Sequence, residues 1–172
     1  PGGGKLLQIV AAQSTSATTV ALGAGGSYAW WTTGLTCAIT PASASNKIHA
    51  IFCGDIGGVT GSTGDGNTAC AVGLAGLDSG SGFGSGTAIS TAAFTLIHPH
   101  MYAYVYDLGD ATGNWFWNCT LHGLTVAGTT SAITYEVYIA PVYGTSARAV
   151  WGNAASSPAS GPGKLILMEI EA

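Results

Sequence analysis

Charged residues are scarce in this sequence. Of its 172 residues, 4 are Lys or Arg and 8 are Asp or Glu, which is 7% of the chain and a net charge of -4; an ordinary globular domain has about 25% charged residues. So few cations cannot neutralise a phosphate backbone, so nucleic-acid binding is excluded. Because scattered charge keeps monomers in solution, the charge-free residues 6–46 predict that subunit contacts cover part of the surface.

Long hydrophobic runs are missing as well. The mean hydropathy is +0.38, but Gly, Ser and Thr interrupt every apolar stretch before it reaches the roughly 18 residues of a membrane-spanning helix. Membrane insertion is therefore not expected. Disorder is not expected either, because disordered chains are poor in apolar residues and rich in charge, whereas this chain is 47% hydrophobic.

The familiar catalytic motifs are absent. There is no GxSxG, no P-loop and no dinucleotide-binding fingerprint, so we predict no catalytic residues and no enzyme activity. The cysteines form no CxxC and have no His partner at zinc-finger spacing. Each lies in an apolar run, which favours buried free thiols over two disulfides; they are Cys37, Cys53, Cys70 and Cys119.

Short β-rich runs separated by turn residues make up most of the chain, and no segment has sustained helical periodicity. The predicted strands are residues 5–11, 15–20, 27–32, 34–40, 47–53, 68–75, 92–108, 114–121, 133–139, 147–151 and 164–171. They predict an all-β fold, an antiparallel β-sandwich resembling a jelly roll. Both terminal strands are apolar on two faces, so we expect them to be central or at a subunit interface, and they could pair with each other.

The domain organisation is simple. Residues 1–4 are predicted to be a Gly-rich linker from an upstream region, and residues 5–172 one β-sandwich domain. Residues 41–46 form a connection of hairpin length between two strong strands. Residues 54–67 and 78–87 are predicted to be long Gly/Ser-rich loops, which are usually functional or flexible. Asp65 and Asn67 in the first loop are candidate ligand-binding residues.

His98 and His100 form the sharpest local motif, His-Pro-His. Alternate residues of an extended strand point the same way, so the two imidazoles could share a metal ion. Further ligands could come from His49 or His122, or from symmetry-related chains about a threefold axis. The alternative is that these are ordinary strand histidines. Apart from such a metal ion, we predict no cofactor.

Aromatic residues are concentrated on two strands. Tyr102 and Tyr104 alternate with apolar residues, so one face of that strand is expected in the core and the tyrosine face at a subunit interface or on a sugar. Trp115 and Trp117 also share a face and could stack on one glycan. Alternatively they anchor the core, which the shortage of large aliphatic residues favours.

Three stretches carry a family resemblance: GKLLQIV at 4–10, TGLTCAITP at 33–41 continued by Ser43, Ser45 and Lys47, and LILMEI at 165–170. Together they resemble the C-terminal module of tailed-phage tail fibres and related virion structural proteins. In that module a GK(V/I)LQVV opening, a TGLSxxITPSSxSSKI hairpin and an ITLMEI closing strand recur in this order. Tyr135 lies where the family has a TYxV strand. The middle, residues 54–114, departs from the pattern in its loops.

The resemblance implies a non-catalytic virion protein, assembled in the bacterial cytoplasm and exposed outside the cell on the particle. Its expected role is a trimeric tail-fibre tip that binds a host surface glycan or protein and contacts other virion proteins. The family supplies no catalytic residues. A capsid decoration or head-fibre protein without a receptor role is the first alternative, and a polysaccharide-cleaving enzyme with paired carboxylates is the second.

Overall fold

The computed structural model describes residues 4–14, 18–21, 31–59, 68–77, 101–107, 114–143, 148–151 and 163–172. These residues form strands and connections without a helix, so no helix in the described ranges could span a membrane. The strands are β1 (Leu6–Gln13), β2 (Thr18–Ala21), β3 (Trp31–Ile39), β4 (Lys47–Val59), β5 (Thr68–Leu77), β6 (Met101–Asp107), β7 (Asn114–Val126), β8 (Ile133–Tyr143), β9 (Arg148–Trp151) and β10 (Lys164–Ile170). The expected all-β class is confirmed.

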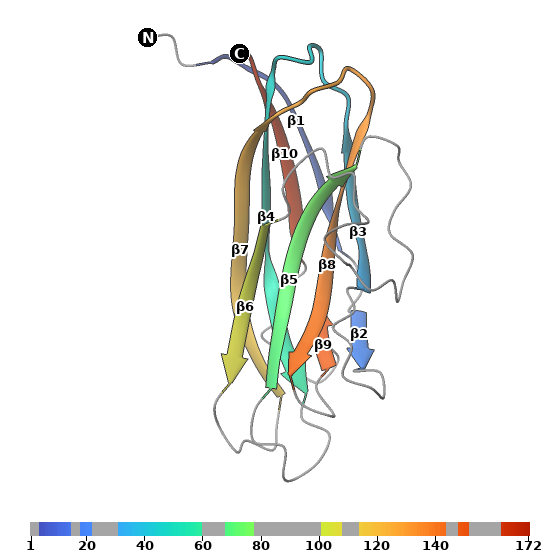
Figure 1. Ribbon diagram of the computed structural model, residues 1–172, viewed down its shortest axis with the longest axis vertical. Helices are drawn as coiled ribbons and strands as arrows, with labels where there is room; N and C mark the ends of the chain where they lie inside the picture. Colours follow the sequence, from blue (N-terminus) through green and yellow to red (C-terminus); the bar gives the residue numbers. More distant parts are fainter. Residues whose placement is uncertain are drawn as a thin grey trace.

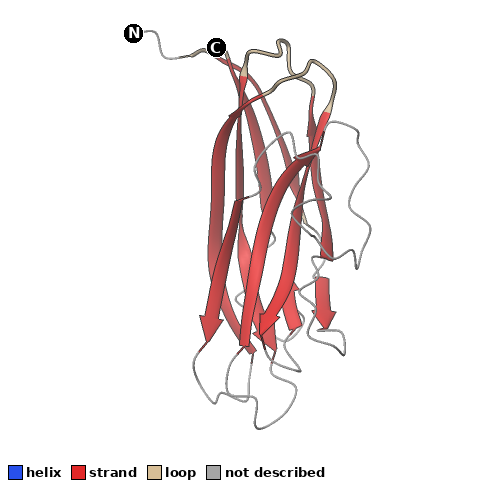
Figure 2. Cartoon of the chain, viewed as in Figure 1, coloured by secondary structure: helices blue, strands red, loops and turns tan. Residues whose placement is uncertain are grey.

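The strands form two antiparallel sheets, which Figures 1 and 2 show as two layers. In the four-stranded sheet the order is β3-β8-β5-β6. In the six-stranded sheet β7 pairs with one edge of β4, and β10 and β9 share the other edge at different levels. β1 pairs with β10 and β2 with β9. This sheet is therefore about four strands wide, and each of the two positions on the side of β4 away from β7 is filled by two shorter strands: β10 and β9, then β1 and β2.

A single hydrophobic core fills the space between the sheets. Because side chains of a strand alternate between its faces, β4 sends Ile48, Phe52 and Ile56 inward, all 0% exposed, and leaves Lys47 and Cys53 outside. The other strands contribute in the same way. The fully buried side chains from both sheets include Ile39, Val72, Ile133, Val137, Ile139, Leu165 and Leu167. This core holds the two sheets face to face.

The terminal strands pair with each other, as their sequences suggested. β1 runs antiparallel to β10 from Leu6 opposite Ile170 to Gln13 opposite Lys164. The pairing does not close the sheet, because β1 remains at its edge. The strands are apolar on both faces, as expected, but only one of these faces is buried. Leu165 and Leu167 are fully buried, whereas Ile9 on the other side of this pair is 56% exposed.

Three predictions about local structure are wrong. Residues 27–32 and 34–40 do not form two strands, because the described part, from Trp31, continues through a bulge as β3. Residues 54–59 are the end of β4 rather than a loop, since pairing with β7 overrides their glycine content. The connection 41–46 crosses from one sheet to the other and does not make a hairpin.

Strand lengths were also underestimated. β7 continues to Val126 and β8 to Tyr143, beyond the predicted ends at residues 121 and 139. In both cases the added residues pair with a long neighbouring strand. Residues 92–100 of the predicted strand 92–108 lie outside the described residues, and β6 accounts for the rest. Ladder pairing therefore decided where these strands end.

Candidate functional site

The predicted ligand-binding residues fall on different parts of the structure. Tyr102 and Tyr104 lie on β6, opposite Gly73 and Ala71 of β5. Trp115 and Trp117 lie on β7, opposite Gly58 and Ile56 of β4. The four aromatics thus belong to two sheets, on their β6 and β7 edges (Figure 1). Asp65, Asn67, His98 and His100 lie outside the described residues, so their ligand and metal roles stay predictions.

The two histidines considered as additional ligands lie together. His49 of β4 and His122 of β7 make an edge-to-face contact with ring centroids 5.9 Å apart. They are diagonal neighbours in the sheet, because His49 is opposite Leu124 and His122 is opposite Ile51. Among the described residues no three His, Cys, Asp or Glu side chains form a metal-binding group.

The cysteine predictions hold in part. Cys37 and Cys119 are buried free thiols, and burial raises the pKa of both. Cys53 is also free but exposed, which corrects the expectation of burial. The apolar residues around Cys53 in the sequence suggested burial. However, Cys53 occupies an outward position on β4, opposite Lys164. The side chain of Cys70 lies outside the described residues.

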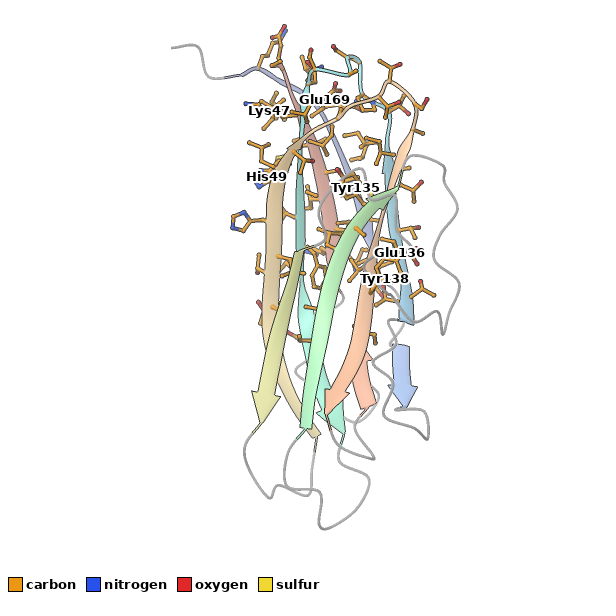
Figure 3. The ribbon with its side chains drawn as sticks, viewed as in Figure 1. Lys47, His49, Tyr135, Glu136, Tyr138 and Glu169 are labelled. Atoms are coloured by element: carbon orange, nitrogen blue, oxygen red, sulfur yellow. The ribbon has the colours of Figure 1, made fainter. Side chains whose placement is uncertain are left out.

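Glu169 is the most unusual polar residue of the described structure, because it is charged and 0% exposed. It lies on β10, near the end of the molecule that carries both termini (Figure 3). Its inward position is one that Leu165 and Leu167 occupy elsewhere on the strand. A buried charge is tolerated only when hydrogen bonds replace its hydration.

Those hydrogen bonds come from distant parts of the chain. Gln8 of β1 donates through Nε2 to Oε2 at 2.5 Å, Asn46 donates through Nδ2 to Oε1 at 2.6 Å, and the backbone N–H of Ala42 donates to Oε1 at 2.7 Å. Burial on its own would raise the pKa of Glu169. The bonds from Asn46, Gln8, Ala42 and the backbone of Ser43 outweigh burial and lower it. Glu169 is therefore held as a carboxylate.

The same bonds fasten the end of the molecule together. Gln8 also donates to the carbonyl of Thr40 at 2.8 Å, and the carbonyl of Asn46 accepts from the N–H of Ala127 at 2.7 Å. The N–H of Gly128 donates to the carbonyl of Ala44 at 2.9 Å. We call Gln8, Ala42, Asn46 and Glu169 the carboxylate clamp. It joins β1, β10, the β3–β4 connection and the β7–β8 connection.

The clamp was missed by the sequence analysis, although its members lie in or next to the stretches that carry the resemblance. Gln8 belongs to GKLLQIV, Glu169 to LILMEI, and Asn46 to the continuation of TGLTCAITP. The available signal was a polar residue at an inward position of an apolar strand. Periodicity could not reveal that Gln8 and Glu169 face the same partner, since 161 residues separate them.

A second buried carboxylate lies on the opposite sheet. Glu136 of β8 is 4% exposed and accepts hydrogen bonds from the hydroxyls of Thr32 and Tyr138, the latter at 2.5 Å. Tyr135 on the inner face of the same strand is 3% exposed, and burial raises its pKa to about 12, opposed by a hydrogen bond with Thr125. The carboxylate of Glu136 is therefore used for hydrogen bonding within the fold.

The outward side of the six-stranded sheet is apolar. One row across it contains Ile9, Met168, His49 and Leu124, and the next row toward the termini contains Leu6, Ile170, Lys47 and Val126. We call these two rows, with Ile51 and Ile166 of the adjoining row, the outer apolar face. The described large hydrophobic side chains that are exposed lie on or beside it: Leu6, Leu7, Ile9, Leu124 and Val126, between 38% and 56% exposed.

Comparisons with known proteins add no assignment. No model of a known protein family matches the chain, and no curated protein matches it. We therefore infer the function from the residues and geometry described above.

Proposed function

We propose that the chain is the receptor-binding tip of a tail fibre of a tailed bacteriophage, a non-catalytic virion protein that binds a host surface glycan or protein. The observation that carries the proposal is the carboxylate clamp. Three stretches that resemble the tail-fibre module are far apart in the sequence, yet they meet around Glu169 at one end of the sheets. The clamp gives a structural reason for these three stretches to occur together in one module, because their residues hydrogen-bond to one another.

The arrangement of strand ends fits a tip. Both termini lie at the clamp end, whereas β4 and β8 end, and β5 and β7 begin, at the opposite end (Figure 1). The part of the sequence that departs from the family pattern, residues 54–114, includes connections that leave from those strand ends. A constant scaffold that presents changing segments on one side is how many binding proteins vary their specificity.

The jelly-roll architecture and the trimer belong to the same proposal. If β1 and β2 count as one interrupted strand and β9 and β10 as another, the strand order in the two sheets is the one expected of a jelly roll, a fold used in viral capsids and lectins. Successive strands then lie in different sheets except for β5 and β6, which pair with each other. The trimer is supported by the low charge and by the outer apolar face. The proposed location is the virion, where the chain contacts other virion proteins.

Binding would use stacking and hydrogen bonding without chemistry. Trp115, Trp117, Tyr102 and Tyr104 supply rings that stack on sugars, and Asp65 and Asn67 supply polar groups. No metal is required for such binding, although His98 and His100 keep their proposed metal-binding role. The two buried carboxylates, Glu136 and Glu169, act within the fold.

The test is binding of the purified chain, displayed on beads, to intact bacteria and to their extracted surface polysaccharides. Alanine variants of the four aromatics and of Asp65 and Asn67 are compared with Thr36→Ala, an exposed strand position away from them. We expect binding to be lost in at least some site variants and kept in Thr36→Ala, with unchanged unfolding midpoints. Binding that no site variant alters, or release of sugar fragments, would contradict the proposal. Absence of any binding would favour a capsid decoration role.

A further inference from the structure

The outer apolar face is unusual in the distribution of charged residues around it as well as in its hydrophobicity. Lys47 lies at one end of it and Lys164 at the other, both exposed, and the two rows that define the face hold no carboxylate. Carboxylates lie just beyond each end. Glu171 follows Ile170 at the Lys47 end, and Asp55 lies two residues beyond Cys53 at the Lys164 end. Charges of both signs therefore lie at each end, and aliphatic side chains, Met168 and His49 lie between them.

We propose that a further copy of this chain covers the outer apolar face, with the copies side by side and their termini at the same end, so that β4 of one copy packs over β10 of the next. This inference deepens the proposed trimer and rests on the proposed function for its threefold order. It assigns the contact surface, the orientation of the copies and the residues that meet.

Charge complementarity is the first argument for a second copy. β4 carries Lys47 at the terminus end and Asp55 at the far end. β10 begins with Lys164 at the far end, and Glu171 follows its last residue at the terminus end. When β4 lies over β10 of an aligned copy, Lys47 meets Glu171 and Asp55 meets Lys164. The reversed orientation would bring Lys47 of one copy toward Lys164 of the other, which like-charge repulsion opposes.

Shape and composition are the second argument. Between those charges the outward residues are Ile51 and His49 on β4 and Ile166 and Met168 on β10. Two flat sheet faces with aliphatic side chains interdigitate at about 10 Å, as in the interior of a β-sandwich. Around a threefold axis the three outer apolar faces turn toward the axis, and these side chains of β4 pack against those of β10 of the next copy.

The size of the sheet is the third argument. β4 and β7 are each 13 residues long, so the whole outward side of a sheet four strands wide covers about 43 Å by about 19 Å, or roughly 800 Å². One side of a standard protein–protein interface buries about this area. The contact therefore starts at the outer apolar face and extends along the rest of this side of the sheet. Burying exposed aliphatic side chains such as Ile9, Leu124 and Val126 also covers apolar surface. In a chain with so few charges, such surface favours aggregation.

The first experiment measures the oligomeric state of the chain by sedimentation and light scattering. The variants Leu124→Lys and Val126→Lys place a charge on the face at positions that are more than half exposed in the single chain, so folding should be preserved. Thr36→Lys and Ala38→Lys are the matched controls, because they are exposed strand positions on the other sheet. We expect the first pair to dissociate the assembly, with a dissociation constant raised at least about a hundredfold, and the controls to leave it intact.

The second experiment tests the alignment by exchange of charge between chains. Asp55→Lys and Lys164→Glu should each weaken assembly about tenfold. An equimolar mixture of the two variant chains should restore it in part, because a ring of three chains then has complementary charges at two of its three contacts. Lys47→Glu mixed with Glu171→Lys is the corresponding pair at the other end. Because Asp55 accepts a hydrogen bond from Asn118 at 3.0 Å, the unfolding midpoint of Asp55→Lys is measured alongside. If that variant is unfolded, the mixture of Lys47→Glu and Glu171→Lys tests the alignment in its place.

The outcomes separate this inference from the proposed function. A wild-type chain that stays monomeric, or an assembly that the Leu124 and Val126 variants leave intact, would overturn the proposed interface. Mixtures that fail to restore assembly would overturn the alignment. If monomeric Leu124→Lys displayed on beads still binds bacteria, the receptor role stands without the interface, whereas an assembly that binds no bacterium keeps the interface and loses the receptor role.

Discussion

At the scale of single residues, Glu169 is where the fold depends most on polar contacts. The carboxylate is fully buried, and the loss of its hydration is offset by Gln8 of β1 and by Ala42 and Asn46 of the β3–β4 connection. The donors and the acceptor belong to three separate segments, so the clamp forms only when all three are in place. This explains why a residue near the end of an apolar strand is acidic and not another leucine.

Removal of that carboxylate should be costly. In Glu169→Ala the donors of Gln8, Ala42 and Asn46 lose their acceptor inside the protein, and each unsatisfied buried group costs about 1–3 kcal/mol. We expect unfolding in urea to show a loss of about 3–5 kcal/mol. Glu171→Ala, two residues along and exposed, is the control and should change stability by less than about 0.5 kcal/mol. Equal stability of the two variants would show that the clamp does not stabilise the fold.

The clamp also predicts an acid dependence of stability. The pKa of Glu169 is lower in the folded chain than its ordinary value of 4.5, so its carboxylate stabilises the fold above that value. The contribution is lost as pH falls through the folded-state pKa. Urea titrations below pH 4.5 should show a decline that is smaller in Glu169→Gln, which has no proton to gain. Parallel declines in the two proteins would assign the acid sensitivity to other groups.

At the scale of elements, glycine positions decide how two strands run. Gly34 has φ +75°, a left-handed conformation, and sits in the bulge of β3 between Thr32 and Thr36. The hydroxyl of Thr33 fixes the bulge, since it donates to the carbonyl of Val137 at 2.7 Å and accepts from the N–H of Leu35 at 3.1 Å. Thus the TGL motif marks a bulge inside a strand, where the sequence pattern indicated a break.

Two glycine substitutions should differ in cost because their physical causes differ. In Gly34→Ala the added Cβ meets nothing within 4 Å, so the cost is that of the left-handed backbone alone, about 1–2 kcal/mol. In Gly4→Ala the Cβ would lie 2.2 Å from the carbonyl oxygen of Glu171 and 2.6 Å from Cγ2 of Ile170, so the start of the chain must move away from β10. Unfolding midpoints of the two variants measure the costs.

The structural consequence of the two substitutions should differ too. Gly4→Ala should increase hydrogen exchange at Glu171, whose N–H donates to the carbonyl of Lys5 at 2.8 Å, and leave β3 protected. Gly34→Ala should affect β3 and β8. Exchange that increases over the whole molecule in both variants would contradict a local role for either glycine.

At the scale of the whole molecule, the structure separates a scaffold end from a far end. The termini and the connections 40–46 and 127–132 lie together at one end (Figure 1), where Glu169 of the carboxylate clamp also lies (Figure 3). A fibre tip attached through its terminus would present the other end to a cell. Copies aligned through the outer apolar face would present their far ends in the same direction, which favours simultaneous contact with several receptors.

That arrangement predicts strong dependence of binding on valency. Several aligned tips gain avidity without any new contact, by a factor of about 10²–10⁴. Binding of the assembled chain to bacteria should therefore exceed that of monomeric Leu124→Lys by at least about a hundredfold, and display of the variant on beads should recover it. The same affinity for both proteins in solution would mean that one tip accounts for binding.

What the sequence by itself determined is the class of structure and the location of its strands. Alternating and continuous apolar runs in β4, β8 and β10 predict strands because side-chain direction along a strand is a local property. The pairing of the terminal strands was also foreseen from their matching character. Local pattern likewise indicated an irregularity near Gly34, as a break between two strands, and a connection at 41–46, although the roles of both were different from those predicted.

Only the tertiary structure decided which strands share a sheet and which outward faces stay uncovered. β3 and β4 are joined by a short connection yet lie in different sheets, because each pairs along its length with distant strands. The clamp depends on Gln8 and Glu169 being brought together across 161 residues. Two-sided apolar strands suggested burial on both sides, but folding one chain buries only one face. The other face, from Leu6 to Val126, is also apolar, and it remains exposed because no segment described in this chain covers it.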